Sequence, residues 1–309
     1  NGATVEANDE AIRAIEKCSF VDTIYLTRME STKQAFDIPS ISLRKRRIAE
    51  DTLPDAPPPV ASIEQLDQLN LLPLHQAGYK GQGIRIGIAD GGFYNANSMT
   101  ALPKEQWLGY ADFTDDEDDF FGSTGNHGTL CLTAIIAEVP DYQGTATEAE
   151  YFLFRTEEHY SESPKEIDNW VAAIEMADSL GLDIVSTSLG YTTFDNEHFD
   201  FTYADMDGRC SRGAQAATIA ARKGMLLIMA AGNEGNNEWH HLSTPADADS
   251  ILTVGAVDID GEIAAFSSYG PSADGRVKPE VCAVGKQTVL LNPSDGWVMT
   301  GNGTSFACP

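Results

Sequence analysis

One serine near the end of the chain has the surroundings of a catalytic nucleophile. Ser305 lies in the segment GTSFACP at 303–309, between a glycine-threonine turn and a proline. The first turn of a helix tolerates proline and leaves backbone N–H groups unpaired, so the segment predicts a helix that starts beside Ser305. The N–H of Ser305 would then be free next to its hydroxyl, which is half of an oxyanion hole. An ordinary capped helix is the alternative that this segment alone leaves open.

Three polar residues elsewhere in the chain have side chains of the kinds that an active serine needs. A serine hydroxyl needs a base, a carboxylate that orients the base, and a second oxyanion donor. His127 is the candidate base, because it opens an apolar helical pattern after a Gly-Asn loop. Asp90 ends a buried-strand run and is the candidate carboxylate. Asn233 follows another such run, among glycines that permit close approach of a ligand. Each has an ordinary interpretation as a turn or cap residue, but together they predict an activated serine.

The elements that must position these residues alternate along the chain as in a parallel sheet. Apolar runs predict strands, with helical patterns between them, at 84–90, 151–154, 184–189, 225–231 and 252–257. A capping box with proline at the first helical position starts a helix at Ser163, and another helix, around 215–223, stops at Gly224. A dinucleotide-binding fold is excluded, because Gly81-Gln82-Gly83 precedes its strand and the fingerprint must follow one.

The first 60 residues are organised differently from the rest. A helical pattern at 8–18 and a strand pattern at 20–26 look like the second half of a small α+β unit within 1–30. Residues 31–60 lose periodicity and combine a basic run, 44–47, with a Pro-rich stretch, which predicts a linker. The basic run is a candidate processing site, with a solvated charge run as the alternative.

The domain at 61–309 is predicted to begin with an amphipathic helix that carries Ile63, Leu66, Leu69 and Leu72 on one face.

The whole chain has 309 residues and is 42% hydrophobic, enough for a full core. Its 20 basic and 47 acidic residues give a net charge of −27, which argues against nucleic acid and membrane surfaces as partners and leaves cations and peptides. Five scattered cysteines form neither a disulfide framework nor metal-ligand spacing.

The motifs resemble those of the subtilisin-like serine proteases, the subtilases. Asp90-Gly91-Gly92, His127-Gly128-Thr129, Ala231-Gly232-Asn233 and the GTSFACP segment occur in the order Asp, His, Ser of that family. The resemblance covers about 61–309 and is greatest to subtilases of Bacteroidetes-type bacteria. It implies an α/β, three-layer fold with a mainly parallel central sheet. It also implies that 1–30 are the partial α+β remnant of an inhibitory propeptide and 31–60 a processing region.

The resemblance assigns roles residue by residue. Ser305 would attack a peptide carbonyl, His127 would move the proton, Asp90 would fix the imidazole, and Asn233 with the Ser305 N–H would bind the oxyanion. A second set would bind substrate. Ser188, Leu189 and Gly190 would pair with the peptide as an added strand, and Ala230, Ala231, Gly232 and Ser243 would line a roomy, uncharged pocket for the residue before the cleaved bond.

The implied function is a serine endopeptidase that works through an acyl-enzyme on protein or peptide substrates. It would be made as a zymogen inhibited by its own propeptide, and be secreted, periplasmic or on the cell surface. A non-catalytic, subtilase-like peptide-binding module is the alternative. The catalytic motif ends at the last residue, Pro309, so we expect a chain truncated after the nucleophile, whose activity on its own the sequence leaves open.

No cofactor is expected to be required, and the sequence assigns no metal ligands. The acidic loop at 115–119 and the turn at 205–208 carry oxygen ligands suited to calcium, with solvated carboxylates as the alternative. Some residues depart from the family pattern: Gly91 replaces the usual serine or threonine, and Val284, Phe306 and Cys308 are also uncommon. Cys131, one helical turn after His127, is expected to be a buried, inert thiol.

Overall fold

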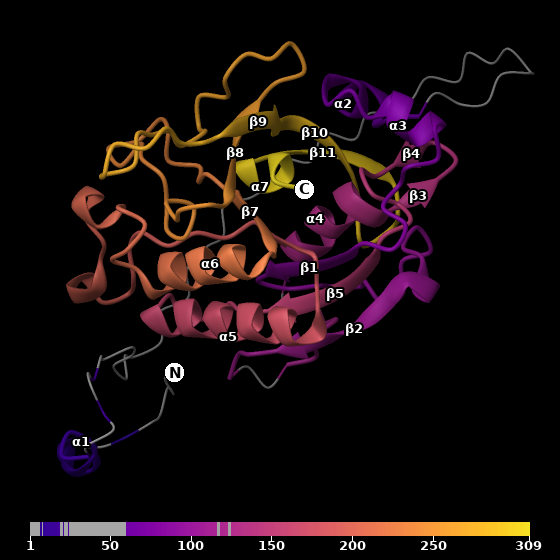
Figure 1. The fold of residues 1–309 in the computed structure, drawn as a ribbon. Coiled ribbons are helices and arrows are strands. Elements are labelled where there is room, and N and C mark those ends of the chain that lie inside the picture. Colours follow the sequence, from indigo (N-terminus) through magenta and orange to yellow (C-terminus); the bar gives the residue numbers. More distant parts are fainter. Residues whose placement is uncertain are drawn as a thin grey trace, which may run out of the picture.

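Figure 1 shows the chain as a computed structural model, which describes residues 7, 9–18, 21, 24, 60–115, 118–122 and 125–309. Seven strands form the central sheet, and every pair of neighbours is parallel. In spatial order they are β2 (Trp107–Asp112), β5 (Glu150–Arg155), β1 (Arg85–Asp90), β6 (Ile184–Thr187), β7 (Leu226–Ala230), β8 (Leu252–Val257) and β9 (Val281–Val284).

Helices cover both faces of this sheet and make three layers (Figure 1). On one face, α5 (Pro164–Leu180) and α6 (Arg212–Lys223) bury residues such as Trp170 and Ala217 against Ala89 and Leu227. On the other, Ile88 packs in a cluster with residues of α4 (His127–Ile136). Ile88 and Ala89 are neighbours in β1, so the two-residue period of the strand sends alternate side chains into the two core layers. This confirms the predicted three-layer α/β fold.

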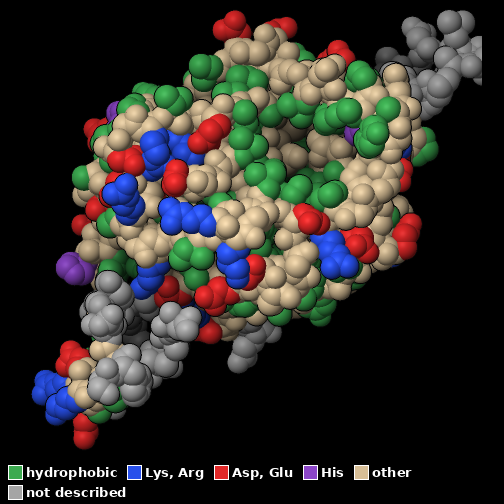
Figure 2. Space-filling view, viewed as in Figure 1, with side chains coloured by type: hydrophobic (Ala, Val, Ile, Leu, Met, Phe, Trp, Pro, Cys, Tyr) green, Lys and Arg blue, Asp and Glu red, His purple; other side chains and the backbone are tan. Residues whose placement is uncertain are grey.

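The remaining elements are short. They are α1 (Asp9–Ile15), α2 (Ile63–Gln68), α3 (Leu72–Gln76), α7 (Thr304–Ala307), the hairpins β3 (Glu138–Val139) with β4 (Tyr142–Gln143) and β10 (Lys286–Leu291) with β11 (Val298–Asn302), and 3-10 turns at Lys104–Gln106, Glu197–Phe199 and Tyr203–Asp205. In Figure 2, hydrophobic side chains gather around a hollow near the C-terminal residue marked in Figure 1. No helix in the described ranges combines the length and the apolar character that a membrane span requires.

The five predicted strands are present, and the capping box at Ser163 starts α5, which ends at a left-handed Gly181. The single amphipathic helix predicted from Ile63 to Leu72 is wrong. The chain there forms α2 and α3, because Asn70 adopts a left-handed conformation between them, and of the predicted apolar face only Leu66 is buried. The predicted strand at 20–26 and the linker at 31–60 lie outside the described residues, apart from single positions.

Candidate active site

Asp90 and His127 meet at the carboxyl end of the central strand β1. Asp90 is fully buried, and its carboxylate oxygens lie 2.8 and 3.0 Å from Nδ1 of His127. The N–H of Gly91 donates to the same carboxylate at 2.8 Å, so a main-chain donor supports Asp90 although the family's usual hydroxyl is missing. A carboxylate only accepts, so Nδ1 carries the proton and Nε2 is left as the basic nitrogen.

The first turn of α4 packs so closely on β1 that only glycine fits after the histidine. The N–H of Gly128 donates to the carbonyl of Gly92 at 2.9 Å. A Cβ at Gly128 would lie 2.7 Å from both the Cβ of Asp90 and the Gly92 oxygen. This packing brings the imidazole and the carboxylate within hydrogen-bond distance.

The electrostatics of this pair favour a charged imidazole. Burial lowers the pKa of His127, but the charge of Asp90 and the hydrogen bond to it outweigh that effect and hold the pKa well above its ordinary value of 6.5. The His127 side chain is 36% exposed, so solvent reaches the ring and limits the cost of burial. The ring of Phe306 packs beside it, with centroids 5.6 Å apart, which gives this uncommon residue a role in holding the imidazole.

Ser305 lies in the first turn of α7, as predicted, and is almost fully buried. Its carbonyl oxygen accepts hydrogen bonds from Oγ of Ser188 at 2.8 Å and from Sγ of Cys131 at 3.4 Å. Its hydroxyl donates to the carbonyl of Ser188 at 3.3 Å. Ser188 and Cys131 therefore hold the backbone of the serine in place. The hydroxyl of Ser305 must rotate away from the carbonyl of Ser188 before it can donate to a histidine.

Asn233 presents the amino end of its amide to the cleft. Its Oδ1 accepts both the N–H of Thr304, at 2.8 Å, and the hydroxyl of Thr304, at 3.0 Å. A backbone N–H can only donate, so these contacts fix which end of the amide is oxygen. The Nδ2 group points away from Thr304 and is free to donate to a ligand.

These residues share one cleft of about 350 Å³. The predicted residues that line it are Asp90, His127, Ser188, Leu189, Gly190, Ala230, Gly232, Asn233, Ser243 and Ser305. Ala231 does not line it, because it is fully buried and its N–H donates to the carbonyl of Val254 at 3.0 Å. Gly190 is needed there, since a Cβ would lie 2.0 Å from Oγ of Ser243.

The lining also contains acidic residues that the sequence analysis missed: Glu157, Glu162 and Glu234. The cleft as a whole is therefore acidic, while the uncharged pocket for the residue before the cleaved bond stays a prediction. The position of Glu157 in the sequence could have identified it as a residue of the cleft. It follows β5, which neighbours β1, and Arg155 of β5 is in register with Asp90, so both strands deliver residues to the same edge of the sheet.

All the cysteines of the described residues are free thiols, and Cys131 is 1% exposed. Burial raises the pKa of Cys131, which agrees with the predicted inert thiol. Cys308 is also buried, and its Sγ donates to the carbonyl oxygens of Thr187 and Ile228 at 3.4 Å.

Two groups of possible metal donors occur in the described residues, and each has its donor atoms within 4.8 Å of one another: Asp90, His127 and Cys131, and Glu157, Glu162 and Glu166. Described carboxylates of the two acidic segments singled out for calcium are engaged in other contacts. Asp118 pairs with Arg155 at 2.9 Å and Asp115 with Lys165, while Asp205 and Asp207 accept hydrogen bonds within their own turn.

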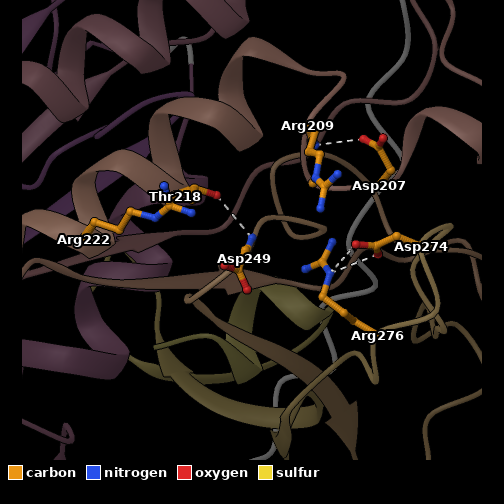
Figure 3. A pocket seen from close by; sticks show the side chains of 8 residues that line it. Asp207, Arg209, Thr218, Arg222, Asp249, Asp274 and Arg276 are labelled. Carbon is orange, nitrogen blue, oxygen red and sulfur yellow. Dashed lines mark hydrogen bonds and ion pairs between the residues drawn. The ribbon is translucent and has the colours of Figure 1, made fainter.

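A second cavity, of about 220 Å³, lies beside α6 (Figure 3). Three arginines and three aspartates line it with Gly208 and Thr218: Arg209, Arg222, Arg276, Asp207, Asp249 and Asp274. Arg276 pairs with Asp274 at 2.8 Å and donates to the carbonyls of Asp247 and Ala248, so it braces neighbouring loops. None of the described residues that line this cavity is a serine, cysteine or histidine, so they offer no counterpart to the first cleft.

Comparison with known proteins identifies relatives by sequence and by fold. A profile of the subtilase family matches residues 81–309. Subtilisin DY of Bacillus licheniformis is 31% identical over 237 residues, 75% of this chain and 75% of that protein. The membrane-bound transcription factor site-1 protease of Mus musculus is 28% identical over 250 residues, and subtilisin-like protease SBT6.1 of Arabidopsis thaliana 27% over 245.

The aligned region spans 76% of this chain but only 21% of the mouse and Arabidopsis proteins. Among solved structures, MycP1 with its N-terminal propeptide removed superposes with a TM-score of 0.59 at 21% sequence identity, over 79% of this chain and 80% of that one. The relatives come from a mammal, a plant and Bacillus, so the Bacteroidetes-type subgroup stays a prediction. The chain belongs to the subtilase family of serine peptidases.

Proposed function

We propose that this chain hydrolyses peptide bonds as a serine endopeptidase, with Ser305 as nucleophile, His127 as general base and acid, and Asp90 as the residue that orients and stabilises the imidazolium. The observation that carries the proposal is one cleft lined by all three together with Asn233, in which Asp90 and His127 lie 2.8 Å apart. Four such groups in one cleft are the requirement of acyl transfer by an activated serine.

The reaction would proceed in two halves. Ser305 Oγ attacks the carbonyl carbon as Nε2 of His127 takes its proton, and the negative oxygen is bound by Nδ2 of Asn233 and the Ser305 N–H. The imidazolium then gives its proton to the leaving amine, which frees the amine product and leaves the acyl group on Ser305. Water, activated by the same imidazole, releases the acid and restores the hydroxyl.

Substrate would bind as an added strand along 188–190, with the residue before the cleaved bond in the pocket near Ala230, Gly232 and Ser243. The cleft position of these residues and the absence of a side chain at Gly190 support this, since a peptide backbone needs room to approach. No cofactor is required in this scheme, because protein groups supply nucleophile, base and oxyanion donors. Full activity after treatment with a chelator such as EGTA is the expected result.

Labelling by a fluorophosphonate probe tests the proposal. The probe should attach to the chain and fail to attach to the Ser305→Ala variant, with circular dichroism to show that both are folded. One observation favours the alternative of a peptide-binding module: the hydroxyl of Ser305 donates to Ser188. A folded chain that binds peptides but is never labelled would make that alternative the correct one.

We also propose that the chain is made as a latent, exported precursor whose N-terminal residues inhibit the cleft. Support comes from the propeptide-like pattern within 1–30 and from MycP1, whose solved structure is described as having an N-terminal propeptide removed. Cleavage within 31–60 should raise the rate of probe labelling. Equal rates before and after cleavage would contradict latency, and cell fractionation would test export.

A further inference from the structure

The lining of the cleft that holds the proposed triad is acidic. Asp90, Glu157, Glu162 and Glu234 line it, and none of its described lining residues is a lysine or arginine. Four carboxylates against the one imidazole of His127 give the lining a net negative charge, and such a lining attracts ligands of positive charge. A peptide side chain that lies near these carboxylates would therefore bind more tightly if it carried a positive charge.

The neighbouring lysine and arginine side chains pair with other carboxylates and do not neutralise Glu157 or Glu162. Lys165 contacts Glu158 at 2.7 Å and also Asp115, and Arg155 contacts Asp112 at 2.7 Å. Within the described residues, neither Glu157 nor Glu162 forms an ion pair with a lysine or arginine of the chain. These two carboxylates are open to a cation from outside.

Glu157 is held in place by uncharged donors. The hydroxyl of Tyr191 donates to its Oε1 at 2.6 Å, and the hydroxyl of Thr156 donates to the same oxygen at 3.1 Å. Tyr191 directly follows the segment 188–190, and a Cβ at Gly91 would lie 3.4 Å from the side chain of Glu157. Glu157 thus lies between the loop after Asp90 and the segment proposed to bind the substrate strand.

A third carboxylate nearby has a structural task. Both oxygens of Glu166 accept backbone N–H groups at the start of α5, from Glu158 at 2.9 Å and from Ser163 at 2.8 Å. Glu166 is 1% exposed and does not line the cleft. It holds the loop that carries Glu157 and Glu162, and it leaves these two as the groups that a ligand can meet.

We propose that Glu157 and Glu162 form a specificity subsite that binds a cationic side chain, lysine or arginine, of the peptide on the N-terminal side of the cleaved bond. This inference rests on the proposed function, because it names the substrate class of the same cleft. It adds an acidic subsite to the uncharged pocket that the sequence analysis expected for the residue before the cleaved bond.

The charge of this subsite depends on pH. Burial raises the pKa of Glu157 to about 7, and the charges of Asp90 and Glu158 add to it against the hydrogen bonds from Tyr191 and Thr156. Burial, with Glu157 and Asp195, raises the pKa of Glu162 to about 8. Glu162 is exposed, so solvent reduces the effect of burial on its pKa. Glu157 therefore determines most of the pH dependence of the subsite. The other ionisable groups around the pair are Lys165 and Glu166 of α5, and burial, with the charges of Glu157 and Glu162, raises the pKa of Glu166 to about 11.

The experiment compares kcat/KM for matched peptides that carry lysine, norleucine or glutamate at each position before the cleaved bond. Norleucine keeps the hydrocarbon stem and removes the charge. At pH 8.5 we expect lysine to exceed norleucine by about tenfold at one position, the effect of one charge-assisted hydrogen bond. The ratio should rise as pH increases from 6 to 9, because lysine stays charged while the glutamates lose protons.

Two variants locate the effect. The double variant Glu157→Gln, Glu162→Gln should bring the lysine-to-norleucine ratio close to one, while Glu175→Gln, an exposed residue of α5 outside the cleft, should leave the ratio unchanged. A ratio near one in the unmodified chain, a ratio independent of pH, or a ratio retained in the double variant would each overturn the subsite. Fluorophosphonate labelling separates this failure from failure of the peptidase proposal, since labelling does not depend on the peptide side chain.

Discussion

At the scale of single residues, Asn233 connects the two parts of the proposed oxyanion hole. Its Oδ1 accepts the N–H of Thr304, the residue before the nucleophile, so the amide and the serine backbone are fixed relative to each other. Replacing Asn233 with alanine removes a donor that acts on the developing negative charge. We expect Asn233→Ala to lower kcat by about 10²–10³, or roughly 3–4 kcal/mol, with little change in KM.

A neighbouring amide gives the matched control. Asn236 is exposed in the same loop and does not line the cleft, so Asn236→Ala should keep the original kcat. Steady-state kinetics on one uncharged peptide measures both variants. A loss of less than about threefold in the Asn233 variant would contradict an oxyanion role, because a single donor typically supplies about 10²-fold or more.

The pKa of His127 predicts the acid limit of activity. The base must be neutral to take the serine proton, and Asp90 holds the His127 pKa well above 6.5. The acid limb of kcat/KM, measured with a norleucine peptide, should therefore have its midpoint above pH 6.5. A midpoint at or below pH 6.5 would mean that Asp90 does not stabilise the imidazolium. The pair stabilises the fold most below pH 6.5, and this contribution is lost as pH rises through the folded pKa.

At the scale of elements, the contact of α4 with β1 controls the site. A Cβ at Gly128 would lie 2.7 Å from Asp90 and from a backbone oxygen of Gly92, and neither can move without shifting the strand. Gly128→Ala should destabilise the fold by about 1–3 kcal/mol through overpacking and lower kcat/KM further by displacing His127. Urea unfolding and peptide hydrolysis measure the two effects.

Gly213→Ala in α6 is the control, because its Cβ would meet other atoms at the ordinary distance of 3.4 Å. It should leave kcat/KM unchanged and stabilise the fold by about 0.5–1 kcal/mol, since glycine is a poor helix former. Equal stability of the two variants would show that α4 is not packed as tightly as described.

The strands differ in how well their presence could be predicted from the sequence. The central strands were predicted because both of their faces are buried, which gives continuous apolar runs such as 84–90. The edge strands β2 and β9 were missed because only part of each is buried. The motif residues were found from local patterns. Glu157 was not, because its place in the cleft depends on a neighbouring strand far away in the sequence.

At the scale of the whole molecule, the net charge of −27 works against compactness. Salt should therefore stabilise the fold. Raising NaCl from about 10 to about 150 mM shortens the Debye length from about 30 to about 8 Å, and Tm should rise by about 3 °C. Calcium chloride at matched ionic strength is the control. A much larger rise with calcium would indicate a specific cation site, and a fall in Tm with NaCl would contradict the dominance of repulsion.

The order in which the cleft residues occur along the chain has a consequence for biosynthesis. A ribosome delivers Asp90 and His127 early, the substrate segment at 188–190 next, Asn233 later and Ser305 last of all. Domains fold from the N-terminus as they emerge. A growing polypeptide can thus assemble the sheet and most of the cleft while it still lacks its nucleophile, and the translating cell meets a potential peptidase only after nearly all of this sequence has been made.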